Sequence, residues 1–596
     1  MARRTAVCVA FVAGVGVLLA GMLLSRPSAE RAGASEPAGT PEDDTHRRPV
    51  AVALADEGKW LFVANQRSGS VSVVNTVSLK VVREVNVGKK LSDVAITSDG
   101  NRLIAVDEEA GEIIVFRRRD SQLEEPLRVE VGPSPVSVQV SADSTRCVIA
   151  SLWPRRLTVV ELARGANPRA LRTIDLAFAP RTQLLLPESR KLIVADSFGG
   201  RLAVVDLDEG KVESDRLLPA HNIRGLALSA DGTRLLISHQ GLNSRGISSR
   251  DDIHWGNLIT NGLRELRLAT VLDPKADLLR NSRLHRLGDV GRGAGDPTGV
   301  TVAPGGKMVV ALAGVAEVAI GGAEVGAWQR IAVGRRPTAV APNPDGRRAY
   351  ILNTHDDSVS VVDLKAHKVS AEIALAPKVK ANVADRGELL FYDARLSHDG
   401  WFSCHSCHTD GHSNGLLADT LGDGSHGTPK RVLTLLGVKD TGPWAWNGSM
   451  RELDAQIRKS VATTMHGPKL TAGQEDELTA YLKTLVPAPP LGRLRQKADE
   501  AGVRRGREVF ERQGCGNCHV PPSYTSPKAY DVGSGEDASY KSFNPPSLRG
   551  VSQAGPYFHD GRSATLEEVF TQHRHQLKEK LARENLNDLL AFLESL

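Results

Sequence analysis

Residues 345–362 read DGRRAYILNTHDDSVSVV, in which an Asp-Gly turn leads into an apolar run, a short polar turn and an alternating Val-Ser-Val-Val strand. Related stretches occur earlier in the chain, as GKWLFVAN at 58–65, VSVV at 71–74 and DGNRLIAV at 99–106. Short β-branched runs separated by such turns are typical of antiparallel strands. The first half of the chain is therefore predicted to be a repeated β unit.

The repeat has a regular period. Its apolar strand is centred on residues 61, 103, 147, 192, 235, 308 and 349, so successive copies are 42, 44, 45, 43, 73 and 41 residues apart. A period near 40 to 45 residues with four short strands is typical of a propeller blade. Seven copies predict a seven-bladed β-propeller over 48–377, and an array of β-sandwiches fits this regular period less well. The motifs resemble the YVTN-type propeller repeat.

The 73-residue interval places an insertion of about 30 residues in the fifth repeat, at about 241–296. It contains the sequence DDIHW at 251–255 and a basic stretch that ends at Arg292. Insertions of this kind emerge on one face and often contact partners. Two readings stay open, a loop that docks on the domains that follow and a surface loop without a role.

After Pro377 the pattern becomes helical and two CxxCH motifs appear, CHSCH at 404–408 and CGNCH at 515–519. On a helical turn, positions i, i+3 and i+4 share a face. Two thiols can then form thioethers to haem while the histidine binds iron, and CxxCH is typical of such covalent attachment. The predicted haem-binding thiols and iron ligands are Cys404, Cys407, Cys515, Cys518, His408 and His519.

The cysteines could also bind zinc or form a redox disulfide. The first pair with His405, His408 and His412 could form a zinc site, and an exported CxxC could be a redox disulfide. Of the six cysteines, Cys8 lies in the N-terminal segment and Cys147 in an apolar strand pattern typical of a buried thiol. One spare thiol rules out a disulfide framework, and two copies of CxxCH favour haem.

The segment after each motif is also repeated. GV at 437–438, GPWAWNG at 442–448 and Leu453 correspond, with equal offsets, to GV at 550–551, GPYFHDG at 555–561 and Leu566. Each unit begins with a helix before its CxxCH and closes with an amphipathic helix. The sequence thus predicts two small α-helical cytochrome c domains, at 378–490 and 491–596.

The stretches RGELLFYDARLSHDGWFSCHSCH at 386–408 and PPSLRGVSQAGPYFHDGRSATLEEVF at 545–570 resemble the di-haem cytochrome c peroxidase family, which includes the enzyme that matures methylamine dehydrogenase. The resemblance implies two covalently bound haem c groups, one that meets hydrogen peroxide and one that relays electrons. It also implies a tryptophan between them, at the position of Trp446, for which ordinary packing against haem is the alternative. In the family a calcium ion sits between the haems, and the sequence leaves its presence here open.

The distal ligand of the second haem departs from the family. No methionine follows Met465, so the His/Met ligation that is usual for the family's second haem cannot come from this unit. His573 and His575 are the candidates for a bis-His haem, with surface histidines as the alternative.

The distal side of the first haem has three candidates. They are Met465, its neighbour His466, and His426, which resembles the distal histidine loop of the peroxidases. His559 is predicted to line the haem pocket. No residue matches the acidic group that assists peroxide cleavage in the family.

The N-terminus carries an export signal. Arg3-Arg4 precede an apolar run from Ala6 to Leu24 and a segment of small residues, which predicts a signal peptide at 1–34 and a linker at 35–47. An uncleaved membrane anchor is the alternative. The formal net charge of +5 is spread along the chain, and this excludes a nucleic-acid footprint. The sequence therefore predicts a periplasmic protein.

Three functions are compatible with these features. The leading one is a peroxidase that takes electrons from a small donor protein, a c-type cytochrome or a cupredoxin. The second is an oxidase that modifies a protein partner docked on the propeller. The third is an electron carrier with both haems closed, because a shared fold does not guarantee shared chemistry.

Overall fold

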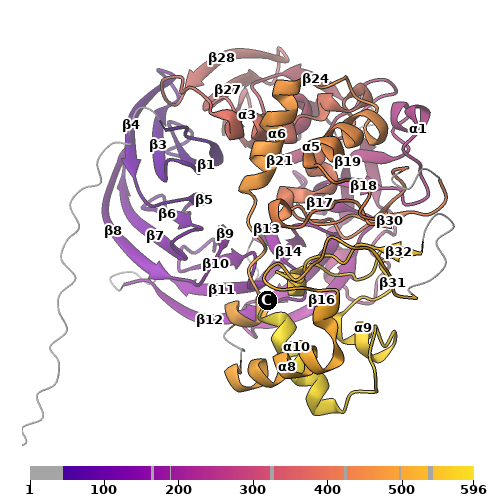
Figure 1. The fold of residues 1–596 in the computed structure, drawn as a ribbon. Helices are drawn as coiled ribbons and strands as arrows, with labels where there is room; N and C mark the ends of the chain where they lie inside the picture. The colour runs from indigo at the N-terminus through magenta and orange to yellow at the C-terminus, as the bar shows by residue number, and fades with distance from the viewer. Residues whose placement is uncertain are drawn as a thin grey trace, which may run out of the picture. The chain divides into compact units, whose positions relative to one another are not determined.

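A computed structural model describes residues 45–162, 167–187, 190–322, 328–421, 426–495, 499–533 and 541–596. The predicted signal segment and most of the predicted linker lie outside these residues. Within the described ranges, no helix combines the length and the apolar character needed to cross a membrane. Strands make up the chain from Pro49 to Ala374, and helices dominate the part that follows (Figure 1).

Seven four-stranded antiparallel sheets follow one another, each made of four consecutive strands. The first four sheets contain β1 (Pro49–Ala55), β2 (Trp60–Asn65), β3 (Ser70–Asn75), β4 (Lys80–Asn86), β5 (Leu91–Ile96), β6 (Arg102–Asp107), β7 (Glu112–Arg119), β8 (Gln122–Glu130), β9 (Pro135–Val140), β10 (Arg146–Ser151), β11 (Arg156–Glu161), β12 (Arg169–Asp175), β13 (Pro180–Leu185), β14 (Lys191–Asp196), β15 (Arg201–Asp206) and β16 (Lys211–Leu217). The last three contain β17 (His221–Leu228), β18 (Arg234–Leu242), β19 (Ile259–Arg267), β20 (Arg283–Arg286), β21 (Pro297–Val302), β22 (Met308–Leu312), β23 (Glu317–Gly321), β24 (Gln329–Ala332), β25 (Pro337–Pro342), β26 (Arg348–Asn353), β27 (Ser358–Asp363) and β28 (Lys368–Ala374).

The seven apolar strands of the sequence repeat are the second strands of these sheets: β2, β6, β10, β14, β18, β22 and β26. The predicted seven-bladed β-propeller is confirmed. Every residue of β2 and β22 is buried, because neighbouring blades cover both faces of each sheet. Cys147 on β10 is fully buried, and burial raises the pKa of its thiol to about 12, as expected for a core thiol.

The ring of blades closes by side-chain packing. Leu61 and Val63 of the first blade share one buried cluster with Tyr350 and Leu352 of the last blade. Burial of each side chain of this size contributes about 1.5–3 kcal/mol. Closure therefore needs no exchange of strands between the two ends of the propeller.

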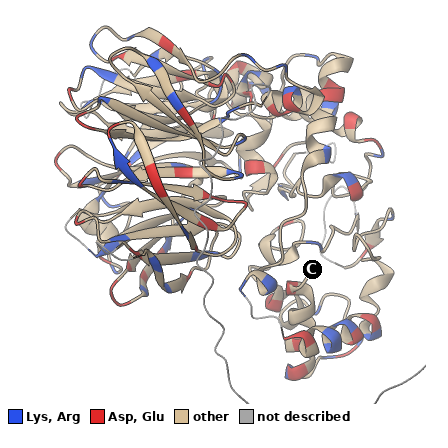
Figure 2. Ribbon diagram, turned by 90° about the vertical axis from the view of Figure 1, so that its left-hand side faces the viewer, with Lys and Arg blue, Asp and Glu red and all other residues tan. Residues whose placement is uncertain are grey.

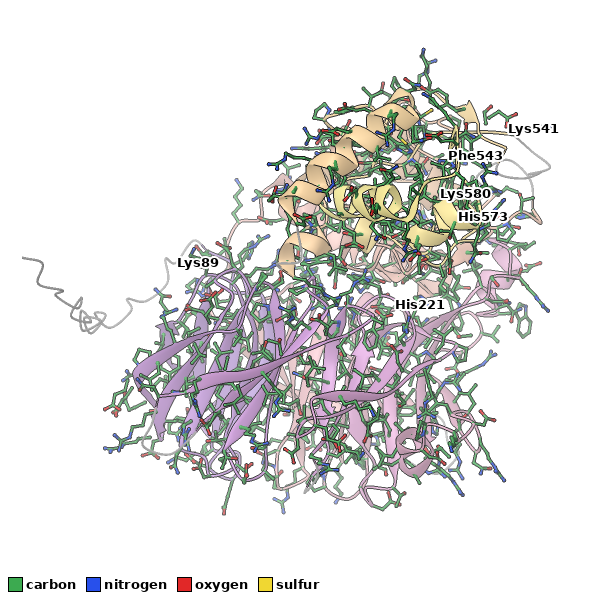
Figure 3. All side chains as sticks on the ribbon, turned by 90° about the horizontal axis from the view of Figure 1, so that it is seen from below. Lys89, His221, Lys541, Phe543, His573 and Lys580 are labelled. Atoms are coloured by element: carbon green, nitrogen blue, oxygen red, sulfur yellow. The ribbon has the colours of Figure 1, made fainter. Side chains whose placement is uncertain are left out.

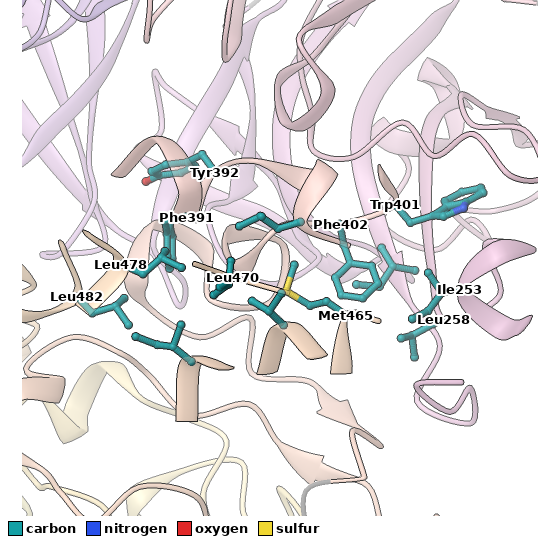
Figure 4. Close-up of a cluster of buried hydrophobic side chains, with 14 of the residues drawn as sticks. Ile253, Leu258, Phe391, Tyr392, Trp401, Phe402, Met465, Leu470, Leu478 and Leu482 are labelled. Atoms are coloured by element: carbon teal, nitrogen blue, oxygen red, sulfur yellow. The ribbon is translucent and has the colours of Figure 1, made fainter. Parts of the chain in front are cut away.

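The extra residues of the fifth blade are spread over longer strands and two short helices, α1 (Arg250–His254) and α2 (Leu268–Leu272). Ile253 and Leu258 of this insertion share a buried cluster with Phe391 and Trp401 from the helical part (Figure 4). The insertion therefore docks on the first haem unit, as one of the two readings of the sequence proposed.

Two similar helical units follow the propeller. The first contains α3 (Val383–Phe391), α4 (Cys404–Cys407), α5 (Leu453–Lys459), a π turn (Ser460–Thr464), α6 (Ala472–Thr484) and the short strands β29 (Leu417–Ala418) and β30 (Lys430–Arg431). After α7 (Leu491–Leu494), the second contains α8 (Glu500–Gln513), α9 (Leu566–Thr571), α10 (Arg583–Glu594), β31 (Tyr530–Asp531) and β32 (Ser542–Phe543). Short 3-10 turns lie at 313–315, 394–396, 398–400, 409–411, 438–440, 515–517 and 551–553.

The first and last helices of each unit cross at a glycine. A Cβ atom on Gly387 of α3 would lie 1.8 Å from the carbonyl oxygen of Glu477 on α6. A Cβ atom on Gly506 of α8 would lie 1.9 Å from the carbonyl oxygen of Asp588 on α10. A larger residue would force these helices apart, so the crossing requires glycine at the same place in both units. The arginine before each glycine also pairs with the acidic residue of the opposite helix.

The propeller contacts the first unit through buried charges. Elsewhere, acidic and basic residues are intermixed on the propeller and on both helical units (Figure 2). Glu388 of α3 lies 3.4 Å from the Nη2 atoms of Arg48 and Arg67, and Arg336 and His355 lie on its other side. Burial opposes the charge of Glu388, but the nearby His355 and the arginines hold its pKa well below the usual range. The first unit is thus fixed by an acidic side chain inside a cationic cage.

Candidate functional site: two haem-binding turns and their junction

The first CxxCH motif forms the single turn of α4. The thiols of Cys404 and Cys407 are unbridged, and burial raises the pKa of both to about 12. The Nδ1 atom of His408 lies 2.8 Å from the carbonyl oxygen of Leu433. Since Nδ1 must donate in this contact, Nε2 carries the lone pair that can bind a metal. Burial lowers the pKa of His408 to about 4, so the ring is neutral at pH 7.

The second CxxCH motif repeats this arrangement. Cys515 begins the 3-10 turn at 515–517, Cys518 caps it, and both thiols are unbridged. The Nδ1 atom of His519 lies 3.1 Å from the carbonyl oxygen of Tyr524, which again leaves Nε2 as the metal-binding atom. Burial lowers the pKa of His519 to about 4. Both proximal histidines are therefore oriented by their own backbone surroundings.

The two candidate distal histidines of the second unit differ in burial. His575 is half-buried, burial lowers its pKa, and it interacts electrostatically with His519. His573, labelled in Figure 3, is exposed. Both rings stand edge-on to Phe558, at centroid distances of 5.2 Å for His573 and 5.4 Å for His575. The structure thus brings His575, and not His573, into the surroundings of the proximal histidine.

The three candidates in the first unit also separate. Met465 is 4% exposed and lies in the buried cluster of Figure 4, against which Cys404 and Cys407 pack. The Nε2 atom of His466 is engaged 2.7 Å from the carbonyl oxygen of Ser248. The side chain of His426 is 37% exposed, with its Nδ1 3.6 Å from a carboxylate oxygen of Asp419. Met465 is therefore in an apolar position near the thiols, and His426 is at the surface.

The two units meet at a junction with approximate two-fold character. The amide of Arg431 donates to the carbonyl oxygen of His559 at 2.6 Å, and the amide of Asn544 donates to that of Trp446 at 2.7 Å. Arg431 and Asn544 hold corresponding positions in the two units, as do Trp446 and His559. The indole of Trp446 donates to the carbonyl oxygen of Arg431 at 2.8 Å, and Phe543 stacks on His559 at 4.1 Å between centroids.

Arg431 is a buried cation in this junction. Its guanidinium lies 5.5 Å from the ring of Trp446 and donates to the carbonyl oxygens of Ala554 and Phe558. Burial lowers its pKa to about 10, so it stays charged at neutral pH. Sequence reasoning singled out Trp446 and His559 but missed Arg431, whose only signal was that the second unit has asparagine at the matching position.

Comparison with known proteins fits this geometry. Residues 381–488 match the family model of the di-haem cytochrome c peroxidases. This region is a di-haem cytochrome c peroxidase domain. The cytochrome c551 peroxidase of Nitrosomonas europaea is 26% identical over 276 residues, which cover 37% of this chain and 82% of the peroxidase. The methylamine utilization protein MauG of Methylorubrum extorquens is 28% identical over 274 residues, 35% of this chain and 76% of MauG. Hydrazine synthase subunit gamma of Kuenenia stuttgartiensis is 25% identical over 279 residues, 36% of this chain and 78% of the subunit.

The propeller holds the first haem-binding turn of the peroxidase domain. Asp296 accepts hydrogen bonds from the hydroxyls of Ser403 and Ser406, both at 2.6 Å, and burial raises its pKa. The Nε2 atom of His221 lies 3.0 Å from the carbonyl oxygen of Ser406, and Gln240 donates to the Ser406 hydroxyl at 3.2 Å. Sequence reasoning missed these propeller residues, because they lie more than a hundred positions before the motif that they contact.

The residues of both haem-binding units fit the haem groups that the matched family implies. Each turn offers two unbridged thiols and a neutral histidine whose Nδ1 is held by a backbone carbonyl, which suits covalent attachment with one axial ligand. The zinc alternative needs further histidines as ligands, and those near the first pair of thiols are engaged elsewhere. His405 accepts from the amide of Asp410, and the Nε2 of His412 lies 2.9 Å from the carbonyl oxygen of Gln553.

Proposed function

We propose that this chain is an exported, periplasmic di-haem peroxidase. It reduces hydrogen peroxide to two water molecules at the first haem unit, with two protons and two electrons from a small c-type cytochrome or cupredoxin that docks at the second unit. Covalently bound haem supplies the redox chemistry, with potential and access set by the surrounding residues. The names of the relatives, the signal-like residues 1–34 and the two matched turns support the proposal. A calcium ion between the haems, as in the family, is part of it.

The junction is the observation that carries the proposal. The Trp446 ring lies where the two units exchange backbone hydrogen bonds, and its indole is fixed by the Arg431 carbonyl. Rigid bonds on both sides keep the two haem-binding units at one separation, which an electron relay requires. The buried charge of Arg431 opposes a positive charge on Trp446, so it tunes the relay toward electron transfer without a long-lived tryptophan cation.

The first unit provides the surroundings for peroxide. Met465 lies in the apolar cluster against which the first pair of thiols packs, while His426 lies on the surface beside Asp419. In this proposal the partly exposed His426 turns inward and passes a proton to the peroxide. The burial of Met465 favours the second candidate function, an electron carrier in which its thioether closes the first haem.

One experiment separates these functions. We expect the half-reduced holoprotein to give a high-spin ferric EPR signal from the first haem and to consume peroxide with a reduced donor. Trp446→Phe should lower this turnover about tenfold, whereas Trp444→Phe, whose indole donates to the Val438 carbonyl inside the first unit, should change it less than about twofold. A solely low-spin spectrum without turnover would establish the electron carrier instead.

A further inference from the structure

Three metal-ligating side chains from distant segments meet where the fifth blade touches the first haem unit. His254 ends α1 of the insertion, and His398 and Asp399 lie on the 3-10 turn that precedes the first CxxCH motif. The Nδ1 of His254 is 2.7 Å and the Nε2 of His398 is 3.4 Å from the same carboxylate oxygen of Asp399. The ligand atoms of these three side chains all lie within 4.8 Å of one another, and no other group of three His, Cys, Asp or Glu in the described part of the chain does so.

We propose that His254, His398 and Asp399 bind a divalent transition-metal ion that joins the propeller to the first haem unit. Ligand atoms around a tetrahedral ion with bonds of about 2.0–2.2 Å are about 3.4 Å apart. The His254 Nδ1 and the Asp399 oxygen, now 2.7 Å apart, therefore need to separate only slightly to admit the ion. Two imidazoles and one carboxylate suit Zn²⁺ and its neighbours rather than Mg²⁺ or Ca²⁺. The side chains are 42%, 18% and 22% exposed, which leaves a path for the ion and room for a water ligand.

The backbone holds both segments in place without the ion. The amide of Gly291 donates to the carbonyl oxygen of His254 at 3.1 Å, and the amide of Gly293 donates to that of Asp399 at 2.7 Å. A Cβ atom on Gly293 would lie 2.5 Å from the carbonyl oxygen of Gly400, so only glycine permits this approach. A site ordered before binding loses little conformational entropy when the ion enters.

The site is connected to the first haem pocket. The amide of His398 donates to the carbonyl oxygen of Met465 at 2.8 Å, and Met465 is the apolar residue beside the first pair of thiols. An ion that fixes His398 therefore also restrains the backbone of Met465. The ion acts as a clamp whose loss loosens the first haem pocket and leaves the second unchanged.

The test uses the full-length holoprotein, stripped with a chelator, incubated with Zn²⁺ and desalted. We expect elemental analysis to find one more zinc per chain in the wild type than in His254→Ala or Asp399→Ala. His285→Ala is the matched control, because His285 makes a 2.8 Å contact with Glu265 in the same insertion but belongs to no group of three. Equal haem content and circular dichroism verify that the variants fold.

The outcomes are distinct. Retention of zinc by the wild type and by His285→Ala, together with its loss in the other two variants, supports the site. Equal zinc in all four proteins, or none in the wild type, overturns it. Zinc should also raise the thermal midpoint of the wild type but not of His254→Ala. This result is independent of peroxide turnover, so it stands or falls separately from the proposed function.

Discussion

The two haem units have the same helices, the same glycine crossing and the same orientation of the proximal histidine, yet the propeller contacts them differently. The first unit places Glu388 among three arginines and His355, and Asp410 between Arg181 and Arg224. In the second, Arg155 of the propeller lies 3.0 Å from the side-chain oxygen of Gln553, and Arg495 donates to the carbonyl oxygen of Pro154. One unit is therefore anchored by buried acid–base pairs, whereas its duplicate is attached mainly by two arginines, Arg155 and Arg495, that donate to uncharged groups.

This difference suggests that the two duplicated haem units have taken on different roles. Charges buried in a matched cage fix one orientation, because any other leaves them unpaired at a large cost. A fixed orientation suits a unit that must keep its peroxide-binding haem at a constant distance from Trp446 at the junction. A unit with few anchors keeps more of its surface for a donor protein. The following substitutions would break or sharpen this contrast.

The largest effect is expected from Glu388→Ala. Removal of the carboxylate leaves buried cations of Arg48 and Arg336 without their partner, and we expect a loss of about 3–5 kcal/mol in the free energy of unfolding. Asp588→Ala breaks the ion pair with the exposed Arg505 in the second unit, and solvent screening makes the expected loss of stability much smaller. Urea denaturation of both variants measures the contrast. Equal losses would show that the first unit is not specially anchored.

The same residue gives the comparison a pH signature. The pKa of Glu388 is held below that of a glutamate in the unfolded chain. Its contribution is then fully present above the ordinary value of about 4.3 and declines as the pH falls below it toward the folded-state pKa. The advantage of the wild type over Glu388→Gln should therefore be constant from pH 7 to about pH 5 and shrink at lower pH. An advantage that grows on acidification would contradict this origin.

Sequence and structure agree wherever the signal is local or periodic. The blade repeat, the two CxxCH turns and the equal offsets between the units follow from short-range patterns, and each appears in the structure. The cage around Glu388, the support of Asp296 and the position of Arg431 join residues from distant parts of the chain. No spacing rule marks such contacts, because any surface Arg or Asp looks the same until the fold brings its partner to it. Even the distal candidates His573 and His575, two residues apart, were separated only by their burial.

A smaller effect is expected from Asp296→Ala. Two buried hydroxyls, on Ser403 and Ser406, lose their acceptor, and we expect a loss of about 1–3 kcal/mol in stability. The first haem-binding turn should loosen, so the EPR signal and reduction potential of the first haem should shift while those of the second stay unchanged. The second haem is thus an internal control. A shift of both haems would mean that Asp296 stabilises the whole domain pair rather than one turn.

The smallest change in stability is expected from the two distal candidates of the second unit. His573 and His575 contact the same ring of Phe558 at nearly the same distance, so alanine at either position removes a similar contact. Each should change the free energy of unfolding by about 0.5 kcal/mol or less.

The spectra of the two variants should differ, because His575 is half-buried near the proximal His519 and, as a neutral imidazole, can bind the iron from the opposite side. His575→Ala should convert the second haem from low-spin to high-spin, while His573→Ala should leave it low-spin. If His573→Ala alone has this effect, the assignment must be reversed. If neither variant has it, the second haem is not bis-His, and the asymmetry between the units would rest on their anchoring alone.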